Sequence, residues 1–254
     1  MAAPEVCLVH TLPNANGFGV LQKYLESQGS VGKKVLVVSE FQETIPSLIT
    51  QLIKSKPDWV DKMLRLDEPL LLESEDLASY DFKNRLYRLR KESEDKNSDF
   101  VSEVLEDALF FFSSITSLEN PTFQQFFKVH KFDSCILLNA GQTPFALSLL
   151  PIALTNKIIL VGDHYIGYPS IKDSVWKKAY DVRNDDIPAY RTSLFERLFT
   201  QSLIRAEDGQ RSICIAIKEQ NYTSQLMVKS SNDHFYQGEI QTQESAKRKK
   251  LMDI

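Results

Sequence analysis

Residues 132–169 read FDSCILLNAGQTPFALSLLPIALTNKIILVGDHYIGYP and contain two short, continuous apolar runs. The runs Ser134–Leu138 and Lys157–Val161 are typical of strands that are buried on both faces of a parallel sheet. Small or polar residues follow each run, Asn139–Gln142 after the first and Gly162–His164 after the second. Ligands of open α/β sheets bind beyond the carboxyl ends of the strands, so these two junctions mark a candidate ligand site.

Strands and helices alternate along most of the chain. Apolar residues repeat at helical spacing in Ile45–Ile53 and in Phe100–Ala108, and Ser193–Glu196 is a capping box that opens another helix. The alternation predicts an α/β fold of three layers, with a parallel sheet between two layers of helices. Further strands are predicted at Val6–His10, Lys34–Val38, Leu109–Phe112 and Ile213–Ile217.

Length and composition indicate an ordinary globular protein. The 254 residues, 43% of them hydrophobic and 25% charged, suffice for one large domain or a domain and a fragment. The sequence contains no apolar run of about 18 residues and no signal-peptide pattern, so we expect an intracellular protein without a membrane partner. The three cysteines, Cys7, Cys135 and Cys214, form no CxxC pair and are interpreted as reduced core residues.

The charges are unevenly distributed. A net charge of −4 argues against a broadly basic nucleic-acid surface. One dense basic patch consists of Lys247, Arg248, Lys249 and Lys250, and it is either a solvated tail or a nuclear-targeting or phosphate-contacting segment. Nuclear localisation is favoured over cytoplasmic localisation. The charge-rich segment at residues 57–99 is interpreted as a helical insertion with a charged linker.

Four segments, in order, resemble the first RecA-like domain of superfamily 1B helicases, the group of the nonsense-mediated-decay helicase, senataxin and the Okazaki-fragment nuclease-helicase, and a fifth resembles the segment that opens their second motor domain. Residues 1–217 are interpreted as this domain, and residues 218–254 as the start of a second motor domain with a basic tail. The similar segments are Lys33–Val38 (motif Ia), Lys131–Gln142 (motif II), Ile159–Tyr165 (motif III), Ser193–Leu198 (the SLFERL helix) and Phe235–Ile240 (the FYxGxL segment).

The phosphate-binding motif departs from the family pattern GxxxxGK[ST]. In that pattern glycine N–H groups cradle phosphates, the lysine reaches the β and γ phosphates, and the hydroxyl binds magnesium. The corresponding run here, Thr11–Phe18, holds Asn16, then Gly17 in place of the lysine and Phe18 in place of the hydroxyl. The resemblance therefore implies that ATP and magnesium binding are lost.

Motifs II and III also lack residues that the family pattern requires for ATP hydrolysis. Leu138 and Asn139 replace the aspartate that holds magnesium and the glutamate that polarises water in motif II. Motif III keeps Gly162 and Asp163, but Ile166 replaces its glutamine. A single lost electrostatic group typically costs about 10² to 10³ in rate, and a lost metal costs several kcal/mol more. We therefore expect no enzyme activity, no catalytic residues and no cofactor.

Some polar residues at the two junctions remain open to interpretation. Asp163 and His164 either bind a residual ligand or satisfy backbone N–H groups of a turn. Gln142 either faces a nucleotide or is a buried, hydrogen-bonded side chain. The other histidines, His10, His130 and His234, show no paired-ligand spacing, so no metal site is predicted.

Three functions are compatible with these observations. The first is a catalytically inactive pseudo-helicase that acts as an interaction or scaffold subunit in DNA or RNA metabolism, with a protein partner. The second is a module that binds single-stranded DNA or RNA without ATP. The third is an enzyme completed by a partner, although the lysine and the motif II carboxylates normally belong to this domain. A decayed gene product without a role is a further alternative, and the sequence does not choose between DNA and RNA.

Overall fold

The computed structural model describes residues 5–12, 17–41, 43–67, 75–92, 99–170 and 191–247. The chain divides into two compact units. The first unit comprises Met1–Glu5, Gln22–Leu138 and Leu149–Ile158, and the second comprises Val6–Leu21, Asn139–Ser148 and Ile159–Ile254.

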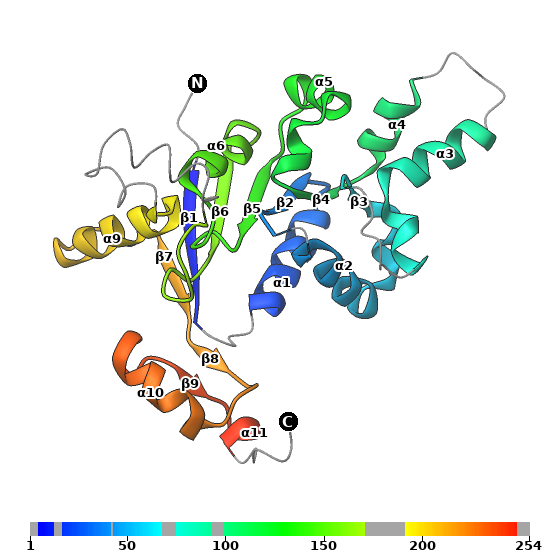
Figure 1. Ribbon diagram of the computed structural model, residues 1–254. Coiled ribbons are helices and arrows are strands. Elements are labelled where there is room, and N and C mark those ends of the chain that lie inside the picture. The colour runs from blue at the N-terminus through cyan, green and yellow to red at the C-terminus, as the bar shows by residue number, and fades with distance from the viewer. Residues whose placement is uncertain are drawn as a thin grey trace. The chain divides into compact units, whose positions relative to one another are not determined.

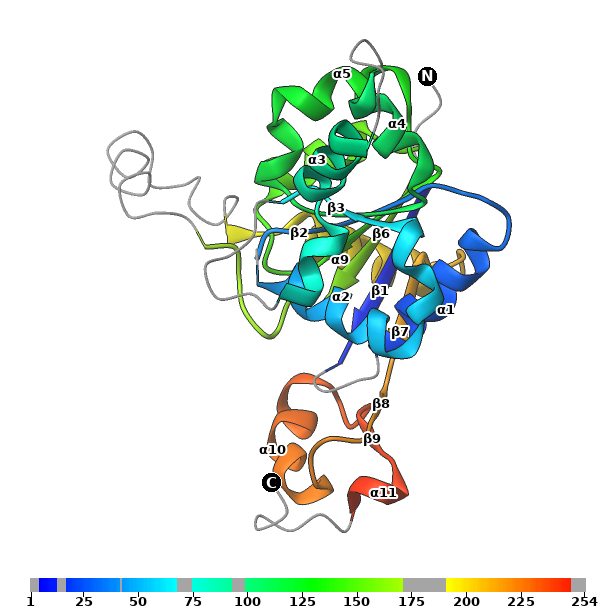
Figure 2. The same cartoon turned by 90° about the vertical axis from the view of Figure 1, so that its right-hand side faces the viewer.

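Seven parallel strands form one sheet in the order β3-β4-β2-β5-β6-β1-β7 (Figure 1). Helices surround the sheet, as the two views of the ribbon show (Figures 1 and 2). This arrangement confirms the predicted three-layer α/β fold of the RecA-like kind, and all of the predicted strands are present. The strands are β1 (Glu5–Thr11), β2 (Val35–Ser39), β3 (Met63–Arg65), β4 (Phe110–Ser114), β5 (Ser134–Leu138), β6 (Lys157–Gly162) and β7 (Cys214–Ile217).

Strand β2 lies at the centre of the first unit. It pairs with β4 and β5, so that Val37 faces Phe112 on one side and Ile136 on the other. Val35–Val38 and the aromatic run Phe110–Phe112 are fully buried, as expected for strands covered on both faces. The hydrophobic core of this unit therefore follows from the apolar runs.

Apolar spacing and N-capping side chains account for three helices of the first unit. Helix α2 (Thr44–Ser55) buries the stripe predicted from its apolar spacing, Ile45, Leu48, Ile49 and Leu52. Asp99 caps α4 (Phe100–Asp107) and Asn120 caps α5 (Pro121–Val129), each by accepting a backbone N–H of the first turn. The other helical elements are η1 (Pro57–Lys62), η2 (Glu75–Tyr80), α3 (Phe82–Glu92) and η3 (Thr116–Glu119), with α6 (Phe145–Ala153) lying partly in each unit.

The segment at residues 57–99 is not wholly helical. It contains β3, which pairs in parallel with β4 through Leu64 and Phe111. The strand is only three residues long and includes the charged Arg65, so it lacks the apolar run that identified the others. Arg65 is 1% exposed and forms an ion pair with Asp81, with 2.6 Å between Nε and Oδ1.

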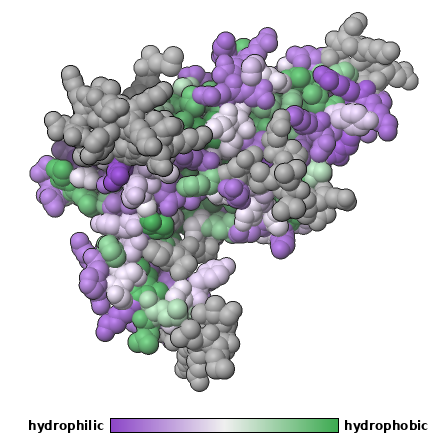
Figure 3. All heavy atoms as spheres, in the orientation of Figure 1, coloured by the Kyte–Doolittle hydropathy of each residue, from purple (hydrophilic) through white to green (hydrophobic). Residues whose placement is uncertain are grey.

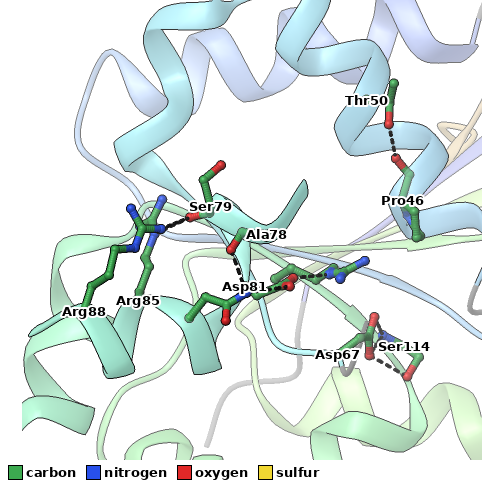
Figure 4. A network of polar contacts seen from close by, with 11 residues as sticks. Pro46, Thr50, Asp67, Ala78, Ser79, Asp81, Arg85, Arg88 and Ser114 are labelled. Carbon is green, nitrogen blue, oxygen red and sulfur yellow. Dashed lines mark hydrogen bonds and ion pairs between the residues drawn. The ribbon is translucent and has the colours of Figure 1, made fainter. Parts of the chain in front are cut away.

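A polar network fixes this segment within the first unit (Figure 4). The carboxylate of Asp67 accepts hydrogen bonds of 2.8 and 2.9 Å from the backbone N–H of Ser114 and one of 2.8 Å from its hydroxyl. Arg85 donates to the carbonyl oxygen of Ser79. Loss of one partner of a buried ion pair such as Arg65–Asp81 typically costs about 3–5 kcal/mol. Residues 57–67 and 75–92 are therefore part of the fold, whereas residues 68–74 and 93–98, which include the end of the predicted charged linker, lie outside the described residues.

The second unit contains β1 and β7 in register, with Leu8 opposite Cys214 and His10 opposite Ala216. Ser193 caps α9 (Leu194–Glu207) by accepting the N–H of Glu196 at 3.0 Å, which confirms the serine half of the predicted capping box. Further elements are α1 (Gly17–Gly29, which continues into the first unit), β8 (Glu219–Gln220), α10 (Gln225–Phe235), β9 (Gln241–Thr242) and α11 (Glu244–Lys247). Leu12, Val228, Tyr236 and Ile240 form one buried cluster.

On the face shown in Figure 3, hydrophobic spheres are scattered among hydrophilic ones. No helix in the described part of the chain is both long and apolar enough to cross a membrane. The three cysteines lie in strands and form no disulfide within the described part of the chain; Cys135 is fully buried, whereas Cys7 and Cys214 are partly exposed.

Candidate functional site

The carboxyl ends of β1 and β6 form the candidate site. These strands are neighbours in the sheet, and the next strands along the chain, β2 and β7, lie on opposite sides of the pair. Such a reversal is where doubly wound sheets bind ligands. The turn after β6, which holds the motif III residues, and the end of β1, which precedes motif I, therefore lie where sheets of this kind bind ligands.

The turns after β5 and β6 touch backbone to backbone. A Cβ atom added to Gly141 would lie 2.5 Å from the carbonyl oxygen of Asp163, and one added to Gly162 would lie 2.8 Å from the nitrogen of Gly141. The N–H of Ala140 also donates to the carbonyl of Val161 at 2.9 Å. Glycine is required at both positions because no side chain fits between the turns.

The motif II turn is shaped by its own backbone. Asn139 has a φ of 54°, in the left-handed region that asparagine tolerates better than most residues. Its carbonyl accepts hydrogen bonds from the N–H of Gln142 and the hydroxyl of Thr143. Leu138 ends β5 and is half-buried. The amide of Gln142 packs against Gly167, where an added Cβ would be 3.2 Å from its Nε2.

Asp163 is the centre of a buried hydrogen-bond network. Its Oδ1 accepts the N–H of Tyr165 at 2.9 Å and lies 3.1 Å from Nε2 of His10. Its Oδ2 accepts the hydroxyl of Tyr236 at 2.7 Å. Asp163 therefore does satisfy a backbone N–H of its turn. No local pattern predicted His10 and Tyr236 as its partners, because they lie 153 and 73 residues away along the chain.

The network determines which of these groups carries charge. Burial by itself would raise the pKa of Asp163, but the hydrogen bonds from His10, Tyr236 and Tyr165 outweigh it, and the pKa lies below its usual value. Burial, followed by the hydrogen bond to Asp163, raises the pKa of Tyr236. Burial also lowers the pKa of His164. At neutral pH the ionised carboxylate of Asp163 therefore accepts a hydrogen bond from the protonated hydroxyl of Tyr236, and the nearby ring of His164 is neutral.

Two histidine rings lie close together at Asp163. The ring centres of His10 and His164 are 5.6 Å apart, and that of Phe199 is 4.9 and 4.8 Å from them. Nδ1 of His164 is buried and has no hydrogen-bond partner among the residues that the structure describes. Each of these two histidines and Asp163 offers one possible metal-ligand atom, and the three atoms lie within 4.8 Å of one another.

The motif I positions are only partly described. Thr11 ends β1, and Gly17 begins α1 with its hypothetical Cβ 3.2 Å from Cγ2 of Thr11. Phe18 lies in the first turn of α1 and is half-buried. Asn16 lies outside the described residues, as do Arg248, Lys249 and Lys250 of the basic patch. Lys247 is the last residue of α11.

A cavity of about 470 Å³ lies beside the motif III turn. Its lining includes His164, Tyr165, Tyr168 and Arg191. Tyr165 and Tyr168 are 47% and 63% exposed, and the guanidinium of Arg191 lies 5.1 Å from the Tyr168 ring centre. Ile166, which occupies the place of the motif III glutamine, is 61% exposed. Among the described residues, the lining therefore presents aromatic faces beside the guanidinium of Arg191 and the carboxylate of Glu196.

Glu40 is the carboxyl group with a strongly raised pKa in the first unit. It directly follows β2, and burial raises its pKa to about 7. Its Oε2 has no hydrogen-bond partner in the described part of the chain. Carboxyl groups tuned in this way are candidates for proton transfer, so Glu40 belongs in any test for catalysis.

Comparison with known proteins gives a partial similarity. No family model matches the sequence. The chain is 42% identical over 52 residues to the DNA replication ATP-dependent helicase/nuclease dna2 of Schizosaccharomyces pombe. The match covers 20% of this chain and only 4% of that protein. Together with the parallel sheet, this partial match is compatible with a helicase-like domain.

Replacement of Gly162 by alanine tests the contact between the turns. The added Cβ has no space beside the Gly141 backbone, so Gly162→Ala is expected to destabilise the protein by about 1–3 kcal/mol. Gly17→Ala is the control, because its Cβ would meet only a methyl group at 3.2 Å, and a change of no more than about 1 kcal/mol is expected. Urea denaturation of both variants measures the difference, and equal stabilities would contradict the proposed constraint.

Replacement of Asp163 by asparagine tests the charge of the network. The pKa of Asp163 is lower in the folded than in the unfolded protein, where it is near 3.8. Its carboxylate therefore stabilises the fold above that pH, and this stabilisation disappears as the pH falls through the folded pKa. We expect Asp163→Asn to cost about 1–3 kcal/mol at neutral pH and progressively less below about pH 4.

Denaturation at several pH values measures this loss. Asp233→Asn is the control, because Asp233 is exposed on α10, and its stability is expected to follow the wild type at every pH. A deficit of Asp163→Asn that stayed constant on acidification would show that the charge of Asp163 does not stabilise the fold.

Proposed function

We propose that the chain is a pseudo-helicase: a RecA-like domain of the superfamily 1B type that does not hydrolyse ATP and acts as an interaction or scaffold subunit in DNA or RNA metabolism. One observation carries the proposal. Leu138 at the end of β5 and Asn139 in the turn after it stand where the resemblance implies a magnesium-binding aspartate and a water-polarising glutamate. The partial similarity to a helicase/nuclease supports the link to nucleic acids.

The hydrogen bonds of Asp163 support the same conclusion. Both oxygens of this carboxylate accept hydrogen bonds from protein groups, namely Tyr236 at Oδ2 and Tyr165 at Oδ1. A magnesium ion keeps most of its water ligands and needs exposed carboxylate oxygens, which a residue only 4% exposed does not offer. The polar group that motif III retains thus has a structural role in this chain.

The missing groups would have to be replaced together to restore hydrolysis. Gly17 and Phe18 supply neither the ammonium group that reaches the phosphates nor the hydroxyl for the metal. Catalysis of phosphoryl transfer consists almost entirely of positioning and electrostatic stabilisation, so a fold without these groups retains little rate enhancement. A partner can donate an arginine across an interface, but the P-loop lysine is built into the domain itself.

Exposed apolar side chains of the second unit are suited to a protein partner. Leu226 and Met227 on α10 are 85% and 50% exposed, and Leu203 and Ile204 on α9 are 51% and 55% exposed. Scattered apolar residues are normal on protein surfaces, but adjacent pairs on two helices offer contact points for an interaction subunit. This is the surface on which substitutions should first be made in pull-down experiments.

A titration with a fluorescent ATP analogue in the presence of magnesium tests the loss of nucleotide binding. We expect no saturable binding up to millimolar nucleotide and no ATPase activity above background. Saturable, magnesium-dependent binding would overturn this part of the proposal, and so would ATP hydrolysis that Asp163→Asn abolishes. Glu40→Gln tests whether Glu40 is a general base for hydrolysis. Hydrolysis that is lost in Glu40→Gln but retained in Asp163→Asn would give Glu40 that role.

A second candidate function is ATP-independent binding of single-stranded nucleic acid. The aromatic faces of Tyr165 and Tyr168, with Arg191 beside them, are the kind of surface on which bases stack. Stacking of one base on an aromatic ring is worth about 1–3 kcal/mol. The Tyr165–Arg191 cavity is therefore the candidate contact for an unpaired strand.

Fluorescence anisotropy with a single-stranded oligonucleotide tests this function. If the cavity binds bases, the affinity should fall at least about tenfold in Tyr165→Ala/Tyr168→Ala and should decrease as salt is added. Tyr87→Ala is the control, because Tyr87 is 68% exposed on α3 in the other unit. No binding at low salt, or equal losses in both variants, would exclude the candidate.

A further inference from the structure

The cluster formed by His10, Asp163 and His164 has the composition of a metal site. Its three ligand atoms, one from each residue, lie within 4.8 Å of one another. Two imidazoles and one carboxylate are donors that zinc-type cations prefer, and three protein ligands with one open position occur in many zinc sites. The histidines lie 154 positions apart, so spacing along the chain gave no sign of the cluster.

The distances suit a small tetrahedral ion. Zinc binds imidazole nitrogen and carboxylate oxygen at about 2.0–2.2 Å, which places neighbouring ligand atoms about 3.3–3.5 Å apart. His10 Nε2 and Asp163 Oδ1 are already 3.1 Å apart. In the absence of a metal these two atoms share a proton as a hydrogen bond, and a metal ion would replace that proton.

His164 supplies the third ligand. Its buried Nδ1 has no hydrogen-bond partner in the ranges that the structure describes, so ring rotation toward the other two ligands breaks no contact at this atom. The residue also lines the cavity of about 470 Å³, which leaves room for a water molecule as the fourth ligand. An unsatisfied buried nitrogen is costly, and metal binding would satisfy it.

The surroundings hold the carboxylate as expected for a metal ligand. Tyr236 donates its hydroxyl to Oδ2 of Asp163 at 2.7 Å, and the N–H of Tyr165 donates to Oδ1 at 2.9 Å. Ligating carboxylates are commonly oriented by such hydrogen bonds. Phe199 lies against both histidine rings and shields the cluster with apolar surface.

We propose that His10, Asp163 and His164 bind one divalent transition-metal ion of the zinc type. The ion links the end of β1 to the turn after β6, and through Asp163 and Tyr236 it stabilises the segment that follows α10. Binding of the ion is independent of nucleotide, and with three protein ligands it leaves one coordination position open to water. It departs from the expectation, based on spacing alone, that the chain binds no metal.

Cobalt titration of the purified full chain, first stripped with a chelator, tests the proposal. We expect one equivalent of Co²⁺ to bind with the visible absorption of tetrahedral cobalt, to be displaced by Zn²⁺, and to show no thiolate charge-transfer band. Zn²⁺ should raise the Tm of the wild type. A thiolate band would instead place the metal on Cys7 or Cys214, which lie on β1 and β7, and would overturn the assignment.

Variants distinguish this site from adventitious binding. His164→Ala should weaken Zn²⁺ binding at least about 100-fold, and Tyr236→Phe, which loses only the hydrogen bond to the ligand, about tenfold. His130→Ala/His234→Ala removes two exposed histidines and should leave the affinity unchanged. Circular dichroism establishes that each variant is folded, and His164→Gln replaces His164→Ala if the latter is not. Equal affinity of the wild type and the His164 variant, or no saturable binding by the wild type, would overturn the proposal.

Discussion

The contact between the turns after β5 and β6 determines the geometry of the candidate site. Gly141 and Gly162 meet backbone to backbone, with no space for a side chain on either. A backbone contact of this kind allows little adjustment, because neither turn can move outward without losing the hydrogen bond between Ala140 and Val161. The position of Asp163 is a consequence, since it is the residue that follows Gly162.

Asp163 then connects parts of the second unit that are distant in sequence. His10 comes from β1, Tyr236 follows α10, and both hydrogen bonds end on one carboxylate that is 4% exposed. A buried charge is tolerated only when its hydrogen-bonding capacity is filled, and here three donors fill it. The same network explains why Tyr236 belongs to a buried cluster with Leu12, although the two residues are far apart along the chain.

Local sequence patterns predicted the fold better than the site. Apolar runs such as Ser134–Leu138 report burial on both faces and need no knowledge of distant residues. Strand β3 was missed because its burial of Arg65 depends on a partner 16 positions away, Asp81. The pattern Gly162–Asp163 marked one half of the site. His10 is an ordinary histidine within a strand, and Tyr236 belongs to the predicted FYxGxL segment, but neither carries a local pattern that pairs it with Asp163.

Fold and chemistry depend on different atoms in a domain of this kind. The sheet is held by apolar side chains such as Val37 and Phe112, and the turns by glycines whose only requirement is space. Nucleotide hydrolysis instead requires a lysine, a hydroxyl and carboxylates at the strand ends, which contribute little to the core. In the pseudo-helicase that we propose, Gly17, Phe18, Leu138 and Asn139 stand in place of those groups, so the chemistry would be lost while the scaffold persists. Asp163 lies at a strand end of this kind, yet its two oxygens accept hydrogen bonds from His10 and Tyr236, so the carboxylate contributes to the fold itself.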